Sequence, residues 1–215
     1  MTDQDTLTLF HSPQSRSAGA LILLEELGAT FDLCVLNMKA GEQRKAAYMA
    51  INPLGKVPAV KRGDALVTEQ VAIFIYLADL FPKAGLAPAI DDPLRGPYLR
   101  WMAFYAACYE PALVDRAMKR DQAPLAMSTY GDWGTMLGAV IEQLSKGSYM
   151  LGERFSAADV LWGCGLGWGT MFGIVPANPV ITAYVERVTS RPAFVKVTAK
   201  DVERAAEHEA ALQPA

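Results

Sequence analysis

Residues 6–28 read "TLTLFHSPQSRSAGALILLEELG", and the fold of the first half of the chain follows from them. A short β-forming run up to Phe10 ends at the Ser12-Pro13 pair, which predicts a buried strand followed by a turn. Serines then precede an apolar, helix-forming run that ends at Gly28, a residue suited to the left-handed conformation at helix ends. The stretch therefore predicts a strand, a turn rich in hydroxyl groups and a helix.

The next residues continue this alternation of strands and helices. Residues 30–38 are rich in β formers, and residues 41–51 are rich in helix formers. Two short β-rich runs follow, at 56–60 and 65–69, and the Gly-Asp pair between them favours a hairpin. An apolar helix is predicted over 70–81. The order β-α-β-α-β-β-α predicts a mixed sheet with helices on its faces, an α/β domain.

The second half of the chain has a different pattern of predicted secondary structure. Residues 83–92 contain proline and glycine without periodicity, which predicts a linker. Strand signals vanish beyond the linker, and one later helix has the Ser156-x-x-Asp159 capping-box form at its start. We therefore expect an α/β domain over 1–82 and an all-α domain over 93–215.

Composition narrows the classes of function. The 215 residues are 52% hydrophobic and carry a net charge of -3 without a Lys/Arg cluster, which argues against a nucleic-acid partner. Three widely spaced cysteines favour a reduced compartment, so cytoplasm is expected, and two histidines without metal-ligand spacing predict no metal. We find no export signal and no apolar run long enough for a membrane span. The chemistry is expected to come from a bound small molecule.

The first candidate site is the hydroxyl-rich turn. Ser12, Ser15 and Ser17 lie where the helix begins, and unpaired N–H groups and the helix dipole favour an anion there. From their spacing alone, the same serines are explained by capping of the helix and bonding of the turn backbone. Since no G-x-S-x-G motif and no plausible histidine partner are found, a Ser-His-Asp hydrolase is not expected.

Two further motifs follow. Val57 before Pro58 must be extended, and a cis bond there would leave a strand edge open for a peptide, with Lys56 beside it. An ordinary proline at a strand start explains the same pattern. Residues 68–70 open a helix, where N–H groups suit an anion and Glu69 suits an ammonium group, although a plain helix start fits as well. Together the three motifs suit a small zwitterionic peptide bearing a thiol.

These motifs resemble those of the cytosolic glutathione S-transferases, over about residues 7–197. The most specific are "NPLGKVPAV" at 52–60 and "TEQVAIFIYL" at 68–77, joined by "SPQSRS" at 12–17 and "FSAADVLWG" at 155–163. The block is most similar to theta- and delta-like members of bacterial type. The resemblance implies a thioredoxin-like first domain that binds glutathione, an all-helical second domain and a homodimer.

The resemblance also implies roles for single residues. Ser12 would donate a hydrogen bond to the glutathione sulfur and favour the thiolate, with Arg16 adding positive potential. Ser15 and Ser17 are alternative thiol partners. Gln70 stands where a serine is usual in the family. The implied glutathione-binding residues are Ser12, Gln43, Lys56, Val57, a cis Pro58, Glu69 and Gln70.

The pocket for the second substrate is harder to predict. Several side chains recur at helical spacing on the first helix of the second domain, and with one histidine they could line a cleft for a small apolar electrophile. The same spacing is typical of an ordinary core. These residues are His11, Tyr98, Trp101, Met102, Tyr105 and Cys108.

The sequence thus predicts a metal-independent glutathione S-transferase that activates the thiolate for attack on small apolar electrophiles. Glutathione-dependent peroxide reduction or dehalogenation would use the same thiolate on another acceptor. A non-catalytic binding module of the same fold is the alternative from another class.

Overall fold

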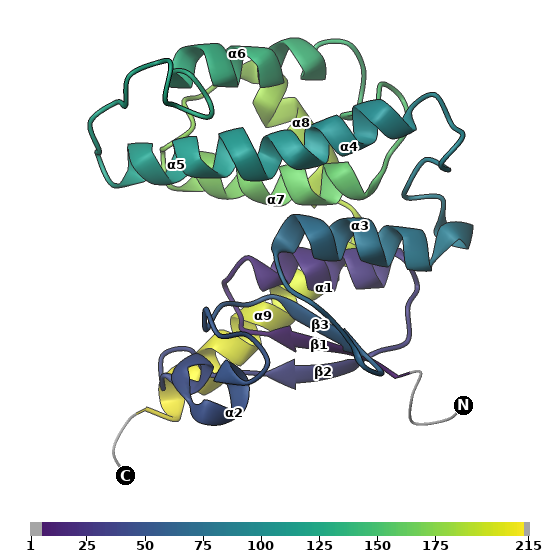
Figure 1. The fold of residues 1–215 in the computed structure, drawn as a ribbon, viewed down its shortest axis with the longest axis vertical. Helices are drawn as coiled ribbons and strands as arrows, with labels where there is room; N and C mark the ends of the chain where they lie inside the picture. Colours follow the sequence, from purple (N-terminus) through teal and green to yellow (C-terminus); the bar gives the residue numbers. More distant parts are fainter. Residues whose placement is uncertain (1–5, 213–215) are drawn as a thin grey trace. The chain divides into compact units, whose positions relative to one another are not determined.

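The structure, a computed structural model, describes residues 6–212 and contains two compact units. The first comprises the chain up to Ala84 together with the C-terminal helix, and the second spans Gly85–Arg191. Figure 1 shows the mixed sheet with its helices in the first unit and only helices in the second. No helix within residues 6–212 is both long enough and apolar enough to cross a bilayer.

The first unit is built on a four-stranded mixed sheet in the order β2-β1-β3-β4. Strand β1 pairs in parallel with β2 and antiparallel with β3, and β3 and β4 form the expected hairpin. The central strand β1 buries Leu7, Leu9 and His11 on alternate positions, as the two-residue period of a strand requires. The strands are β1 (Leu7–His11), β2 (Asp32–Val35), β3 (Ala59–Arg62) and β4 (Ala65–Val67).

Helices of the first unit cover this sheet. Helix α1 contacts α3 and α9 as well as β1, and Leu23 and Leu24 are completely buried in it. A helix that is apolar on nearly all sides is expected where neighbours surround it. The helical segments are α1 (Ser17–Glu26), η2 (Glu42–Arg44), α2 (Ala46–Met49), α3 (Gln70–Leu80), η3 (Pro82–Ala84) and α9 (Pro192–Ala210).

Helix α9 falls in a different unit from the one expected for it. The sequence division placed it in the helical domain, whereas in the structure it lies against α1 (Figure 1). It buries Phe194, Val197 and Asp201, and its Lys196 forms a 2.6 Å ion pair with Glu25 of α1. Burial of this face and the ion pair to α1 account for its grouping with the first unit.

The named elements of the second unit are all helices, as expected. The first of its helices runs from α4 through a π-helical turn at residues 105–109 into α5, where Pro111 lies in the first turn. Proline lacks the N–H for an ordinary helical bond, and wide turns are a recognised way to accommodate such a break. The segments are α4 (Arg95–Phe104), η4 (Tyr105–Tyr109), α5 (Glu110–Ala117), α6 (Trp133–Leu144), α7 (Ala157–Met171) and α8 (Pro179–Thr189).

Trp162 forms the centre of this unit's core. Its ring meets that of Tyr105 edge-on, with centroids 5.2 Å apart, and it lies 5.1 Å from the ring of Tyr109.

A Cβ on Gly165 would lie 2.6 Å from Tyr105, and one on Gly169 would lie 2.5 Å from a neighbouring side chain. The glycines of α7 at these two positions are therefore required by the close approach of neighbouring side chains.

The capping box at the start of α7 is confirmed. Ser156 is the N-cap, and its N–H and hydroxyl donate to Asp159 Oδ2 at 2.9 and 3.0 Å. Asp159 Oδ1 accepts from the Met150 N–H at 2.7 Å and from the Tyr184 hydroxyl at 3.0 Å. Burial raises the pKa of Asp159 to about 6, although these hydrogen bonds act in the opposite direction.

Candidate functional site

The turn between β1 and α1 is held together by two of its three hydroxyl groups. Ser17 Oγ accepts the Ser12 N–H at 3.0 Å, and Ser15 Oγ donates to the Ser12 carbonyl at 2.7 Å. The two oxygens Ser15 Oγ and Ser17 Oγ are themselves 2.7 Å apart. Both backbone groups of Ser12 are therefore fixed by neighbouring side chains.

The third hydroxyl, that of Ser12, is uncommitted. Its Oγ has no hydrogen bond within residues 6–212, and the residue keeps 3% of its surface exposed. Ser17, by contrast, is completely buried and bonded on several sides. Among the three serines, Ser12 alone therefore has a hydroxyl free to bond a group outside the chain.

His11 does not line a surface for an electrophile, because its side chain is completely buried. Its Nδ1 lies 2.9 Å from Ser17 Oγ, and its Nε2 lies 3.0 Å from Asp201 Oδ1. The expectation that no histidine partners these serines is therefore wrong. The three residue types match a hydrolase triad, but Ser17 cannot reach a substrate from its buried position.

Asp201 was missed by sequence reasoning. It lies 190 residues from His11 and carries no motif, so only the fold brings the two together. One signal was available: Phe194, Val197 and Asp201 are spaced three and four residues apart along α9, and all three are buried. A carboxylate that continues the apolar face of a helix is a candidate for a buried polar contact.

At the strand edge predicted to bind a peptide, the backbone has the expected cis bond and unpaired groups. The Val57–Pro58 bond is cis, and neither the N–H nor the carbonyl of Val57 has a hydrogen bond among residues 6–212. The preceding Lys56 carbonyl accepts from the Tyr48 hydroxyl at 2.6 Å and from the Asn52 side chain at 2.9 Å. Two buried side chains thus hold the segment that presents an unpaired backbone.

Gly55 and Gln43 lie next to this edge. A Cβ on Gly55, whose φ is +57°, would meet the Gln43 carbonyl oxygen at 2.8 Å, so only glycine fits there. The side-chain Oε1 of Gln43 is buried without a hydrogen-bond partner in the described part of the chain. Lys56 is exposed, and its amine is available to an anion.

Glu69 and Gln70 begin helix α3. Glu69 is exposed and has a positive φ of 66°, which is uncommon for a residue with a side chain and is typical of functional sites. Gln70 Nε2 donates to the Arg16 carbonyl at 3.1 Å, which links α3 to the serine turn. The first unit therefore brings the serine turn and the start of α3 together.

Most residues expected around the electrophile lie in the interior of the helical unit. Tyr98 and Met102 have no exposed surface, and Trp101 and Tyr105 have 2% each. Cys108 is half-buried, its Sγ donates to the Thr129 carbonyl at 3.4 Å, and burial raises its pKa. The burial of these side chains corresponds to the core interpretation of the pattern.

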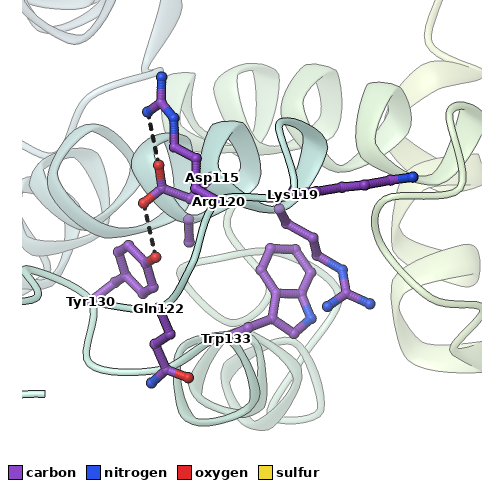
Figure 2. A pocket seen from close by; sticks show the side chains of 8 residues that line it. Asp115, Lys119, Arg120, Gln122, Tyr130 and Trp133 are labelled. Carbon is purple, nitrogen blue, oxygen red and sulfur yellow. Dashed lines mark hydrogen bonds and ion pairs between the residues drawn. The ribbon is translucent and has the colours of Figure 1, made fainter. Parts of the chain in front are cut away.

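The helical unit also contains a polar pocket of about 300 Å³ beside the start of α6 (Figure 2). Asp115 accepts from the Tyr130 hydroxyl at 2.9 Å and from Arg120 at 3.0 Å. The guanidinium of Arg116 lies 4.8 Å from the centre of the Trp133 ring. The pocket includes none of the predicted site residues.

Known proteins resemble the chain along most of its length. The family model described as "Glutathione S-transferase, N-terminal domain" matches residues 5–79, and the corresponding C-terminal domain model matches residues 105–192. Glutathione S-transferase F10 of Arabidopsis thaliana is 27% identical over 210 residues, which cover 90% of this chain and 97% of that protein.

Solved structures agree with these matches. A glutathione transferase from Methylococcus capsulatus shares 29% identity and a TM-score of 0.78, covering 92% of this chain and all of its own. A glutathione transferase homologue from Sulfitobacter, solved with bound glutathione, shares 29% identity and a TM-score of 0.73 over 91% of this chain and 98% of its own. The N-terminal and C-terminal domain models match in that order along the chain. Together with these full-length similarities, they show that the chain belongs to the glutathione S-transferase family.

Proposed function

We propose that the chain transfers glutathione to small apolar electrophiles and that Ser12 activates the thiol. The observation that carries this proposal is the uncommitted Ser12 hydroxyl in a turn whose other two hydroxyls are occupied. The Sulfitobacter homologue with bound glutathione supports glutathione as the co-substrate. A homodimer in the cytoplasm belongs to the same proposal.

Thiolate formation is the first chemical step that the turn can assist. The Ser12 hydroxyl donates a hydrogen bond to the sulfur, which stabilises the anion more than the neutral thiol and lowers the thiol pKa. The N-terminus of α1 adds partial positive charge at this point, and the exposed Arg16 adds a full one. More nucleophile is then present at neutral pH.

The rest of glutathione is held by backbone and charge. The unpaired N–H and carbonyl of Val57 form strand-like hydrogen bonds with the cysteinyl unit. Glu69 and Gln70 receive the γ-glutamyl end, with the Glu69 carboxylate facing the ammonium group. Lys56 and Gln43 approach the glycine carboxylate. Fixing the peptide in this way places the sulfur beside the acceptor, and this proximity contributes to the rate enhancement.

The acceptor determines which reaction follows. Attack of the thiolate on an electrophilic carbon forms a carbon–sulfur bond while the bond to the leaving group breaks and that group departs with the electron pair, which gives the transferase reaction. Peroxides or haloalkanes are acceptors for the same thiolate and remain alternatives. No metal is required in any of these reactions, because the sulfur itself is the nucleophile.

Ultraviolet absorbance of the bound thiolate, titrated with pH, tests the proposal. We expect the wild type to lower the thiol pKa of bound glutathione by about one to two pKa units below its free value of about 8.5. Ser12→Ala should bring it back toward the free value while glutathione still binds, because the Val57 edge is untouched. Binding to the wild type without a lowered pKa would instead indicate a non-catalytic module.

A further inference from the structure

We propose that Asp201 and His11 are positioning residues for the thiol site and that helix α9 thereby fixes Ser12. This inference rests on the proposed function, since it assumes that Ser12 faces the glutathione sulfur. It concerns a buried hydrogen-bonded chain that links α9 to the serine turn and to which neither the sequence motifs nor the family comparisons assign a role.

The chain of hydrogen bonds has one direction. The Asp201 carboxylate can only accept, so His11 Nε2 carries the proton that is shared at 3.0 Å. In the neutral ring Nδ1 is then an acceptor, and Ser17 donates its hydroxyl proton to it at 2.9 Å. The Ser17 oxygen in turn accepts the Ser12 N–H at 3.0 Å. Each donor therefore points toward the carboxylate.

Burial makes this chain strong and selective. His11 and Ser17 have no exposed surface, and Asp201 has 5%. Water cannot replace a missing partner at such positions, so each unpaired group would be costly. Reversal of the imidazole tautomer would turn an N–H toward Ser17 and release the hydroxyl proton of Ser17 from His11. Asp201 prevents that reversal by accepting at Nε2, as the carboxylate of a buried His–Asp pair does.

The consequence falls on the Ser12 backbone. Its N–H is held by Ser17, and its carbonyl accepts from Ser15 at 2.7 Å. The Ser12 N–H is thus set by the chain that ends at Asp201, and the Ser12 carbonyl is set by Ser15, whose Oγ lies 2.7 Å from Ser17 Oγ. If this series of hydrogen bonds is weakened, the Ser12 hydroxyl is still present but no longer points at the sulfur. Thiol activation is then weakened more than glutathione binding.

Asp201→Asn tests this, because asparagine keeps the size and one acceptor oxygen but removes the charge that selects the tautomer. We expect glutathione affinity to change less than about threefold while kcat falls roughly tenfold. A fall of this size is typical when a residue that orients a metal-ligating side chain through a hydrogen bond is replaced. The pKa of the bound thiol should rise toward its free value. Hydrogen exchange at the Ser12 amide should become faster than in the wild type.

Glu25→Gln is the matched control. It removes a different polar contact of α9, the ion pair between Lys196 and Glu25 of α1, and leaves the Asp201 chain intact. We expect its kcat, thiol pKa and Ser12 exchange to match the wild type. His11→Gln provides a second variant should Asp201→Asn fail to fold, with the same expected changes. Loss of activity in Glu25→Gln equal to that in Asp201→Asn would overturn the inference, since general loosening of α9 would explain both.

The measurements separate this inference from the proposed function. A wild type that leaves the thiol pKa of bound glutathione unchanged contradicts the proposed function. Exchange at the Ser12 amide uses no glutathione, so it still tests the link from α9 to the turn in that case. A wild type that lowers the pKa and an Asp201→Asn variant that preserves the pKa, kcat and amide exchange would overturn the inference alone.

Discussion

Asp159 in the helical unit and Asp201 in the first unit are both buried aspartates on helices, yet their hydrogen bonds lead to different places. All donors to Asp159 belong to the start of α7 and the segments packed on it. Asp201 instead accepts from His11, which leads through Ser17 to the backbone of Ser12. The first network is closed and serves the fold, whereas the second ends at a free hydroxyl.

The largest expected effect is on the closed network. Asp159→Ala leaves four hydrogen bonds without their acceptor, two of them from backbone N–H groups, at a completely buried position. We expect the free energy of unfolding to fall by about 3–5 kcal/mol, as when one partner of a buried charged network is removed. Urea denaturation measures the loss. Asp132→Ala, which removes an exposed N-cap of α6, is the control and should cost clearly less.

The pH dependence of the unfolding free energy gives a second test of the Asp159 network. Burial raises the pKa of Asp159 from 3.8 to about 6, so the folded chain binds this proton more tightly than the unfolded chain does. Protonation of Asp159 therefore favours folding as the pH falls from about 6 to about 4. At about 1.4 kcal/mol per pKa unit, the two-unit difference contributes on the order of 3 kcal/mol.

The Asp159→Asn variant isolates this contribution, because it cannot titrate at the position. Unfolding of the wild type and of the variant should be compared between pH 7 and pH 4.5. We expect the wild type to gain stability relative to the variant as the pH falls. A relative loss would mean that the hydrogen bonds outweigh burial and that the pKa is lowered.

The two networks also differ in how readily a sequence reveals them. The Asp159 network begins with a local motif, Ser156 three residues earlier, and capping geometry depends only on neighbours along the chain. The strands, the hairpin and the start of α3 were predictable for the same reason. Local turn chemistry and periodicity determine them, and the structure contains each of them.

The parts that were missed depend on contacts distant in the sequence. No local pattern indicates that α9 packs on α1 or that Asp201 meets His11 across 190 residues. The aromatic stripe of α4 was ambiguous, because one helical period serves both a core and a cleft, and only burial distinguishes them. The resemblance named Ser12, but the choice among three serines gained support only from their hydrogen bonds.

The smallest expected effects concern two contacts of α9, the ion pair of Lys196 with Glu25 and the hydrogen bond of Asp201 with His11. Glu25→Gln breaks an ion pair whose side chains are 27% and 51% exposed, so water screens it and we expect a loss of about 0.5 kcal/mol or less in unfolding free energy. Asp201→Asn changes a buried contact but keeps one acceptor, and about 1 kcal/mol is expected. Chemical denaturation of both variants and their double mutant measures these values, which should add because the sites share no partner. A loss for Asp201→Asn as large as the one expected for Asp159→Ala would show that the open network is as important to the fold as the closed one, and the contrast between them would then lie in function alone.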